Sequence, residues 1–101
     1  MAGNEEKPIE IADPFARQLV GKYLENRKVD IKKLTAALSN ADFDTIRTTG
    51  HNLYGSGAAY GIDDISFIGA SIENAADSSD TDRIERLIGE LGDLLKRLKV
   101  L

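Results

Sequence analysis

The fold is decided by residues 81–99, which read TDRIERLIGELGDLLKRLK. Large aliphatic residues recur in this stretch at alternating steps of four and three, and two more leucines widen the stripe; the set is Ile84, Leu87, Ile88, Leu91, Leu94, Leu95 and Leu98. This spacing is typical of a helix that buries one face in an antiparallel bundle. Basic residues in its final turn suit the negative end of the helix dipole. We therefore predict a helix from Thr81 or Asp82 to Lys99.

Helical signals continue back along the chain from this stretch. Asp13 followed by Pro14 is a helix start, because Asp caps free N–H groups and Pro fits the first turn. Gly61 is placed just after a helix end, where a positive φ is easy for Gly. We expect a first helix that begins at Pro14 and ends near Asn26, and a second, shorter helix that is capped by Asp30 and ends at 39–40. A third helix is capped by Asp42 and runs from Phe43 towards Tyr60. A fourth begins at Asp63 or Asp64 and ends in 77–80.

These segments predict the fold class. Both prolines lie near the start of the chain, and no stretch alternates β-branched and polar residues. Because each helix alone would be marginal in water, a shared core must stabilise them. We expect an all-α fold: an antiparallel up-and-down four-helix bundle with an additional short N-terminal helix, over residues 13–101. A polar N-terminal lead covers residues 1–12, and the 101 residues support one domain.

Composition excludes several kinds of site. The chain has no Cys and one His, which excludes disulfide scaffolds, Cys-ligated metals, Cys nucleophiles and sites that need two imidazoles. The formal net charge of −4 argues against a nucleic-acid partner. No uncharged run approaches the roughly 20 residues of a membrane span, and Met1–Glu10 lacks the apolar core of a signal peptide. We expect a cytoplasmic protein without a membrane partner.

The single histidine, His51, is predicted to face solvent. Residues three or four apart form the inward face of its helix: Phe43, Ile46, Gly50, Leu53, Gly57 and Tyr60. At about 100° per residue, His51 lies roughly 130° from the centre of that face. Gly55 and Ala58 share its side, where Lys or Glu would be ordinary. Since a mid-helix Gly costs about 1 kcal/mol relative to Ala, we interpret Gly55 as clearing space for another molecule. The inward Gly50 and Gly57 instead predict close helix packing.

Residues 51–61 resemble the motif of the histidine-containing phosphotransfer (HPt) domain, the four-helix carrier of multistep two-component phosphorelays. The family pattern is His, any residue, Leu, Lys, Gly, a small residue, and a Gly ten residues after the His. The matching residues are His51, Leu53, Gly55, Ser56 and Gly61. On the next helix the family's Leu-Glu pair appears as Ile72-Glu73. The resemblance covers the chain from about Asp13 to Lys99.

One position departs from the family pattern, since Tyr54 stands where the family has Lys. Tyr54 offers a hydroxyl donor but no positive charge. Arg47, one turn before His51 on nearly the same face, is predicted to supply that charge in part; the alternative is an ordinary solvated Arg. Tyr54 itself is a candidate contact anchor, because exposed aromatic residues often carry binding energy. It is otherwise a partly buried ring at the edge of the bundle.

The resemblance implies that His51 is a phosphoacceptor. It would attack the phosphoaspartate of a receiver domain through Nε2 and pass the phosphoryl group to another receiver. Such transfer depends on alignment and charge neutralisation. No acidic cluster in the sequence surrounds His51, so we expect no metal or cofactor in this chain and place Mg²⁺ on the receiver. With the metal and the acidic pocket on the receiver, the chain is expected to be a phosphocarrier and co-substrate rather than an enzyme. It also lacks a Gly-rich ATP loop, so we expect that it does not phosphorylate itself.

The same resemblance assigns expected roles to the neighbours of His51. Those expected near the phosphoryl group are Arg47, Tyr54 and Gly55, and those expected to dock a receiver are Arg47, Thr48, Tyr54, Gly55 and Ala58. A single apolar face per helix fits a monomer. Three alternatives stay open: a degenerate bundle that binds a receiver without accepting phosphate, a helical interaction protein in which His51 is incidental, and an enzyme with His51 as general base. The last lacks a recognisable nucleophile.

Overall fold

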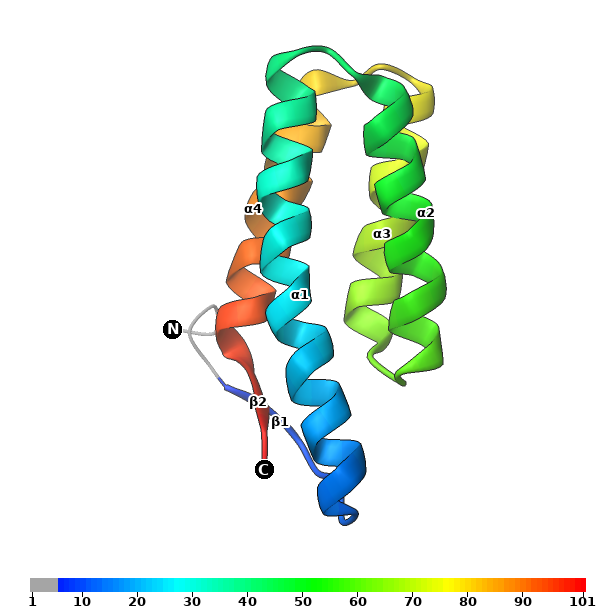
Figure 1. The fold of residues 1–101 in the computed structure, drawn as a ribbon. Helices are drawn as coiled ribbons and strands as arrows, with labels where there is room; N and C mark the ends of the chain where they lie inside the picture. The colour runs from blue at the N-terminus through cyan, green and yellow to red at the C-terminus, as the bar shows by residue number, and fades with distance from the viewer. Residues whose placement is uncertain (1–5) are drawn as a thin grey trace.

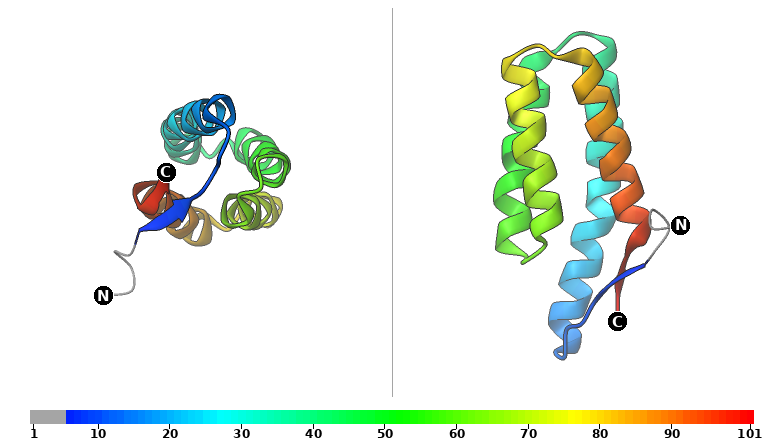
Figure 2. Two further views of the ribbon diagram at one scale, coloured as in Figure 1. Left: turned by 90° about the horizontal axis from the view of Figure 1, so that it is seen from below. Right: turned by 180° about the vertical axis from the view of Figure 1, so that it is seen from behind.

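The computed structural model describes residues 6–101, in which four helices and two short strands are present (Figure 1). In chain order they are β1 (Lys7–Ile9), α1 (Pro14–Ser39), α2 (Phe43–Ala59), α3 (Asp63–Asp77), α4 (Thr81–Arg97) and β2 (Leu98–Val100). The chain turns back at three short loops, so α1 and α3 point one way in Figure 1 and α2 and α4 the other. Viewed along their axes, the four helices surround a common centre (Figure 2).

The centre of the bundle is filled by aliphatic side chains from all four helices. The largest fully buried ones are Leu34, Ile46, Leu53, Ile65, Ile72, Ile84, Leu91 and Leu94. The predicted inward face of α2 is confirmed at Ile46, Gly50, Leu53 and Gly57, which are buried. Tyr60, expected on the same face, is exposed at the end of α2. Its ring stacks on that of Tyr23 in α1, with the ring centroids 4.1 Å apart.

The predicted break within residues 14–39 is wrong. α1 is one continuous helix of 26 residues. Asp30 caps no new helix there; its carboxylate lies 3.0 Å from Nε of Arg27, one turn earlier. Tyr23 and Leu34, on either side of the expected break, are both buried in the core, which holds the intervening turns helical. No additional short N-terminal helix is therefore present in residues 6–101.

The two strands were not predicted. β1 and β2 pair in parallel, with Lys7 opposite Leu98 and Ile9 opposite Val100. α4 consequently ends at Arg97, and Leu98, expected in the helix, has an extended backbone with φ −70° and ψ 130°. The pairing ties the polar lead to the end of the bundle. Pro8, which has no N–H to donate, limits further pairing at this edge.

α1 is longer than its partners, and its N-terminal end projects past the loop between α2 and α3 (Figure 1). At about 1.5 Å per residue, α1 is roughly 39 Å long and α2 roughly 25 Å. The projecting part is supported on one side by β2. Its other side has no neighbouring helix.

Candidate functional site

The helix that carries His51 begins and ends at the predicted residues. Asp42 caps α2, with its Oδ2 accepting from the Thr45 hydroxyl at 2.6 Å and its Oδ1 from the Thr45 amide at 3.1 Å. These two hydrogen bonds, the hydroxyl one first, lower the pKa of Asp42. Gly61 follows the C-cap with φ +73°, as expected for its position. Both ends of α2 are thus closed by local contacts, which fixes where the helix presents His51.

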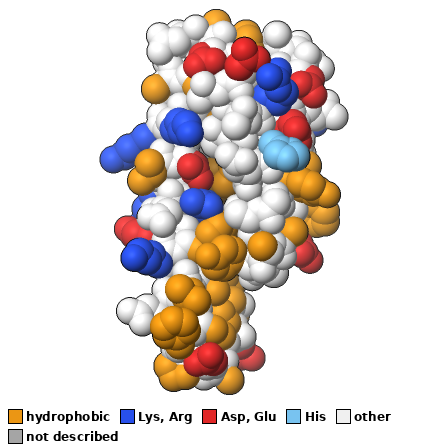
Figure 3. Space-filling view, turned by 45° about the vertical axis from the view of Figure 1, so that its right-hand side comes forward, with side chains coloured by type: hydrophobic (Ala, Val, Ile, Leu, Met, Phe, Trp, Pro, Cys, Tyr) orange, Lys and Arg blue, Asp and Glu red, His pale blue; other side chains and the backbone are white. Residues whose placement is uncertain are grey.

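His51 lies on the solvent side of α2, and this prediction is confirmed. Its side chain is 66% exposed. All five residues predicted to dock a receiver, Arg47, Thr48, Tyr54, Gly55 and Ala58, are also exposed. A Cβ built at Gly55 would meet no atom within 4 Å, so nothing in the bundle requires a Gly there. In Figure 3 the histidine stands at the surface, with hydrophobic side chains below it.

Two glycines on the inner side of α2 allow α3 to approach closely. A Cβ at Gly50 would lie 2.7 Å from the Glu73 amide nitrogen and 2.8 Å from the Gly69 carbonyl oxygen. A Cβ at Gly57 would lie 2.5 Å from the Ser66 amide nitrogen. Real Cβ atoms do not come this near backbone, so only Gly fits at these two positions. The predicted close packing is confirmed, and one of its effects is to bring Glu73 next to the helix that carries His51.

Glu73 bonds directly to the histidine. Its Oε2 lies 3.1 Å from His51 Nδ1. A carboxylate oxygen accepts hydrogen bonds, so in the neutral ring this contact favours the tautomer with the proton on Nδ1. In that tautomer Nε2 carries the free lone pair. In the sequence, Glu73 belongs to the pair that resembles the family's Leu-Glu, and no role was predicted for it. The sequence signal that could have found Glu73 is the pair of glycines Gly50 and Gly69. Because they let α2 and α3 pack closely, they bring Glu73 beside His51.

Arg47 and Tyr54 flank the histidine in different ways. Arg47 Nη2 lies 2.9 Å from Asp44 Oδ1, a pair one turn apart on α2, so its guanidinium is engaged before any ligand arrives. The Tyr54 ring is half-exposed, and its centroid is 6.5 Å from that of His51. Tyr54 is held through its backbone, since its carbonyl accepts from the Ser66 hydroxyl at 2.9 Å. Glu73 therefore bonds to the imidazole and Tyr54 lies next to it, while the guanidinium of Arg47 is paired with Asp44.

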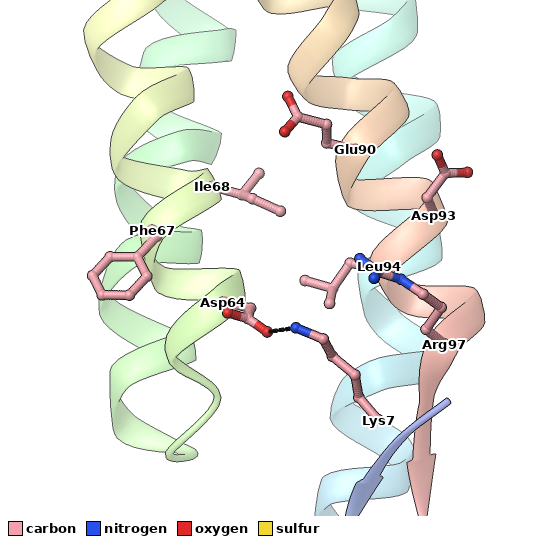
Figure 4. Close-up of a pocket in the computed structure, with 8 residues that line it drawn as sticks. All are labelled: Lys7, Asp64, Phe67, Ile68, Glu90, Asp93, Leu94 and Arg97. Carbon is pink, nitrogen blue, oxygen red and sulfur yellow. Dashed lines mark hydrogen bonds and ion pairs between the residues drawn. The ribbon is translucent and has the colours of Figure 1, made fainter. Parts of the chain in front are cut away.

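Of four cavities found in residues 6–101, none is lined by His51. One of about 310 Å³ lies between α3 and α4, lined in part by Phe67, Ile68 and Leu94 and crossed by a 2.6 Å ion pair between Lys7 and Asp64 (Figure 4). Small-molecule sites are normally concave, whereas His51 stands on an open helix face. This geometry suits a macromolecular partner. Within residues 6–101 no three His, Asp or Glu side chains gather as a metal site, and no helix is long and apolar enough to cross a membrane.

Comparison with known proteins gives one finding. A family model described as Hpt domain matches residues 18–100, which span all but the first turn of α1 and the whole of α2, α3 and α4. No curated protein and no solved structure gives a significant match.

Proposed function

The chain belongs to the Hpt domain family, and from this premise we propose that it is a cytoplasmic phosphocarrier of a two-component phosphorelay. Domains of this family take part in histidine phosphotransfer and are carriers rather than kinases. In our proposal His51 accepts a phosphoryl group from the aspartate of one receiver domain and passes it to another. The chain acts as a monomeric co-substrate, and the receiver contributes the Mg²⁺.

The contact between His51 Nδ1 and Glu73 is the observation that carries this proposal. With the proton on Nδ1, the Nε2 lone pair attacks the phosphorus of the aspartyl phosphate. The bond between phosphorus and the aspartyl oxygen breaks, and its electron pair stays on the released carboxylate. The ring gains positive charge in this step, and the adjacent Glu73 carboxylate offsets that charge. In the transfer to a second receiver, the aspartyl oxygen of that receiver forms a bond to phosphorus. The bond between phosphorus and Nε2 breaks, and its electron pair returns to Nε2.

The proposed docking surface is the exposed band of α2 around His51. Gly55 leaves open space beside the imidazole, and Thr48 and Ala58 present only short side chains. A receiver can therefore bring its aspartate within reach of Nε2. Tyr54, half-exposed next to the histidine, is the proposed contact anchor.

Incubation with a panel of phosphorylated receivers tests the proposal. We expect label on the protein that is lost in acid and retained in base, as phosphohistidine is. Measurable receiver binding without any such label would favour the second candidate, a degenerate Hpt domain that binds receivers only. Tyr54 in place of the family's Lys is the observation behind that candidate.

Glu73→Ala is expected to slow phosphotransfer by about tenfold. This factor corresponds to the free energy that one hydrogen bond to a charged group contributes. The reason is loss of the tautomer that frees Nε2, so we expect two-bond ¹⁵N–¹H NMR to show the ring proton moving towards Nε2. Glu73→Gln keeps an acceptor oxygen and should retain most of the Nδ1–H form. Glu85→Ala, which removes an exposed carboxylate on α4, is the matched control. An unchanged tautomer in Glu73→Ala would contradict this role.

Arg47→Ala is expected to reduce the transfer rate and the phosphohistidine lifetime by about fivefold, or ~1 kcal/mol. We propose that Arg47 partly replaces the missing Lys, turning from Asp44 to the phosphoryl oxygens once His51 is phosphorylated. Asp44→Asn, which frees the guanidinium, should lengthen the lifetime. Arg86→Ala on α4 serves as control. If Arg47→Ala leaves both quantities unchanged, Arg47 is an ordinary solvated residue.

A further inference from the structure

α1 carries an exposed stripe that takes no part in the core. Its members recur at steps of four and three: Phe15, Leu19, Lys22, Asn26, Val29 and Lys33. Such spacing places them along one helix face. The three apolar members are 68%, 47% and 62% exposed. Single exposed apolar residues are ordinary, but several on one helix face mark an interaction surface.

The charge of α1 is opposite to that of the whole protein. α1 has six basic and two acidic residues, whereas the chain has a net charge of −4. Arg27 and Lys28 are paired with Asp30 and Glu25, the two acidic residues of α1. Lys22 and Lys33, on the stripe, form no ion pair within residues 6–101. α3 is the reverse case, with four carboxylates and no basic residue. An acidic partner is therefore attracted to the α1 side of α2 and repelled from the α3 side.

The stripe adjoins the face that carries His51. Lys33 lines a shallow hollow of about 230 Å³ together with Thr48, which is on the exposed side of α2 one turn before His51. Further down, α1 and α2 are joined by a 2.7 Å hydrogen bond between the Tyr23 and Ser56 hydroxyls. In Figure 3, hydrophobic side chains cover the lower end of the molecule, basic ones lie above them at the left, and the histidine lies on the same face at the upper right.

We propose that the receiver docks across α1 and α2, with the stripe as its second contact. The inference rests on the proposed function and specifies the partner surface. A receiver presents the carboxylates of its metal pocket and an anionic phosphoryl group, which complement the lysines of α1. Lys22 and Lys33 thereby supply positive charge that the motif lacks at Tyr54. Phe15 and Leu19, on the projecting end of α1, add apolar contact beyond the end of α2.

Charge reversal on the stripe tests the electrostatic part of this proposal. Lys22→Glu combined with Lys33→Glu is expected to raise the KM for a phosphorylated receiver at least tenfold and to flatten its dependence on salt. Lys32→Glu is the matched control, since Lys32 is exposed on α1 next to Lys33 but outside the stripe. Labelling of His51 by phosphoramidate, which needs no docking, should be the same in all variants.

The apolar part of the docking proposal is tested by two phenylalanines of equal exposure on different helices. Phe15 on α1 and Phe67 on α3 are both 68% exposed. We expect Phe15→Ser to weaken receiver binding several-fold and Phe67→Ser to leave it unchanged. The opposite result, or stripe variants that behave like Lys32→Glu, would overturn the docking proposal while the phosphocarrier function stands. If phosphoramidate labels His51 but no receiver does, the proposed function fails, and this inference fails with it.

Discussion

His51→Gln is expected to abolish the acid-labile label from every receiver, with a loss of transfer rate above about a thousandfold, or ~4 kcal/mol. The sequence contains no other imidazole, so no second site can take over the phosphoryl group. Glu73 would still be present in this variant but would have no ring to orient. Quantifying ³²P transferred from a labelled receiver checks the expectation.

The folded state is expected to survive this change, because the His51 side chain is 66% exposed and its hydrogen bond to Glu73 lies at the surface. Circular dichroism and the denaturation midpoint of His51→Gln should match those of the wild type. Asn52→Gln, which introduces the same side chain at the next exposed position, is the control that should retain full label. Acid-labile label remaining on His51→Gln would show that His51 is not the acceptor.

Gly57→Ala is expected to lower the free energy of unfolding by about 2–4 kcal/mol, as overpacking against rigid backbone does. The added Cβ would lie 2.5 Å from the Ser66 amide nitrogen and 3.0 Å from its Cα. Neither atom belongs to a side chain that can turn away, so α2 and α3 must separate. We expect this loss of stability even though Ala is more favourable than Gly within a helix by about 1 kcal/mol.

Gly55→Ala is the matched control for this prediction. Gly55 lies half a turn before Gly57 on the opposite side of α2, and an added Cβ there meets nothing within 4 Å. We expect this variant to gain up to about 1 kcal/mol from helix propensity alone. Urea unfolding of both variants makes the comparison. Equal stabilities would mean that α2 and α3 do not approach as closely as the structure has them.

Local features of this protein could be read from its sequence. Asp13 and Asp42 were predicted as helix caps, and their carboxylates accept from the amides of Phe15 and Thr45. The exposed position of His51 followed from the phase of apolar residues on α2. The pairing of Arg47 with Asp44 is also local, since residues three apart adjoin on a helix. Each of these depends on residues within a turn or two of one another.

Other features were decided by contacts between distant parts of the chain. Burial of Tyr23 and Leu34 against other helices made α1 continuous across a weak break signal at Asp30. β1 pairs with β2, from the opposite end of the described chain. Three-residue strands are too short to leave a recognisable alternation.

The bond between His51 and Glu73 belongs to this second group, because it joins residues 22 positions apart. The sequence by itself determined which residue is exposed and available for chemistry, since helical periodicity is a local property. Which nitrogen of that residue is free was decided only by the tertiary structure. Backbone contact at Gly50 and Gly69 sets the register of α2 on α3, and that register brings the carboxylate to Nδ1.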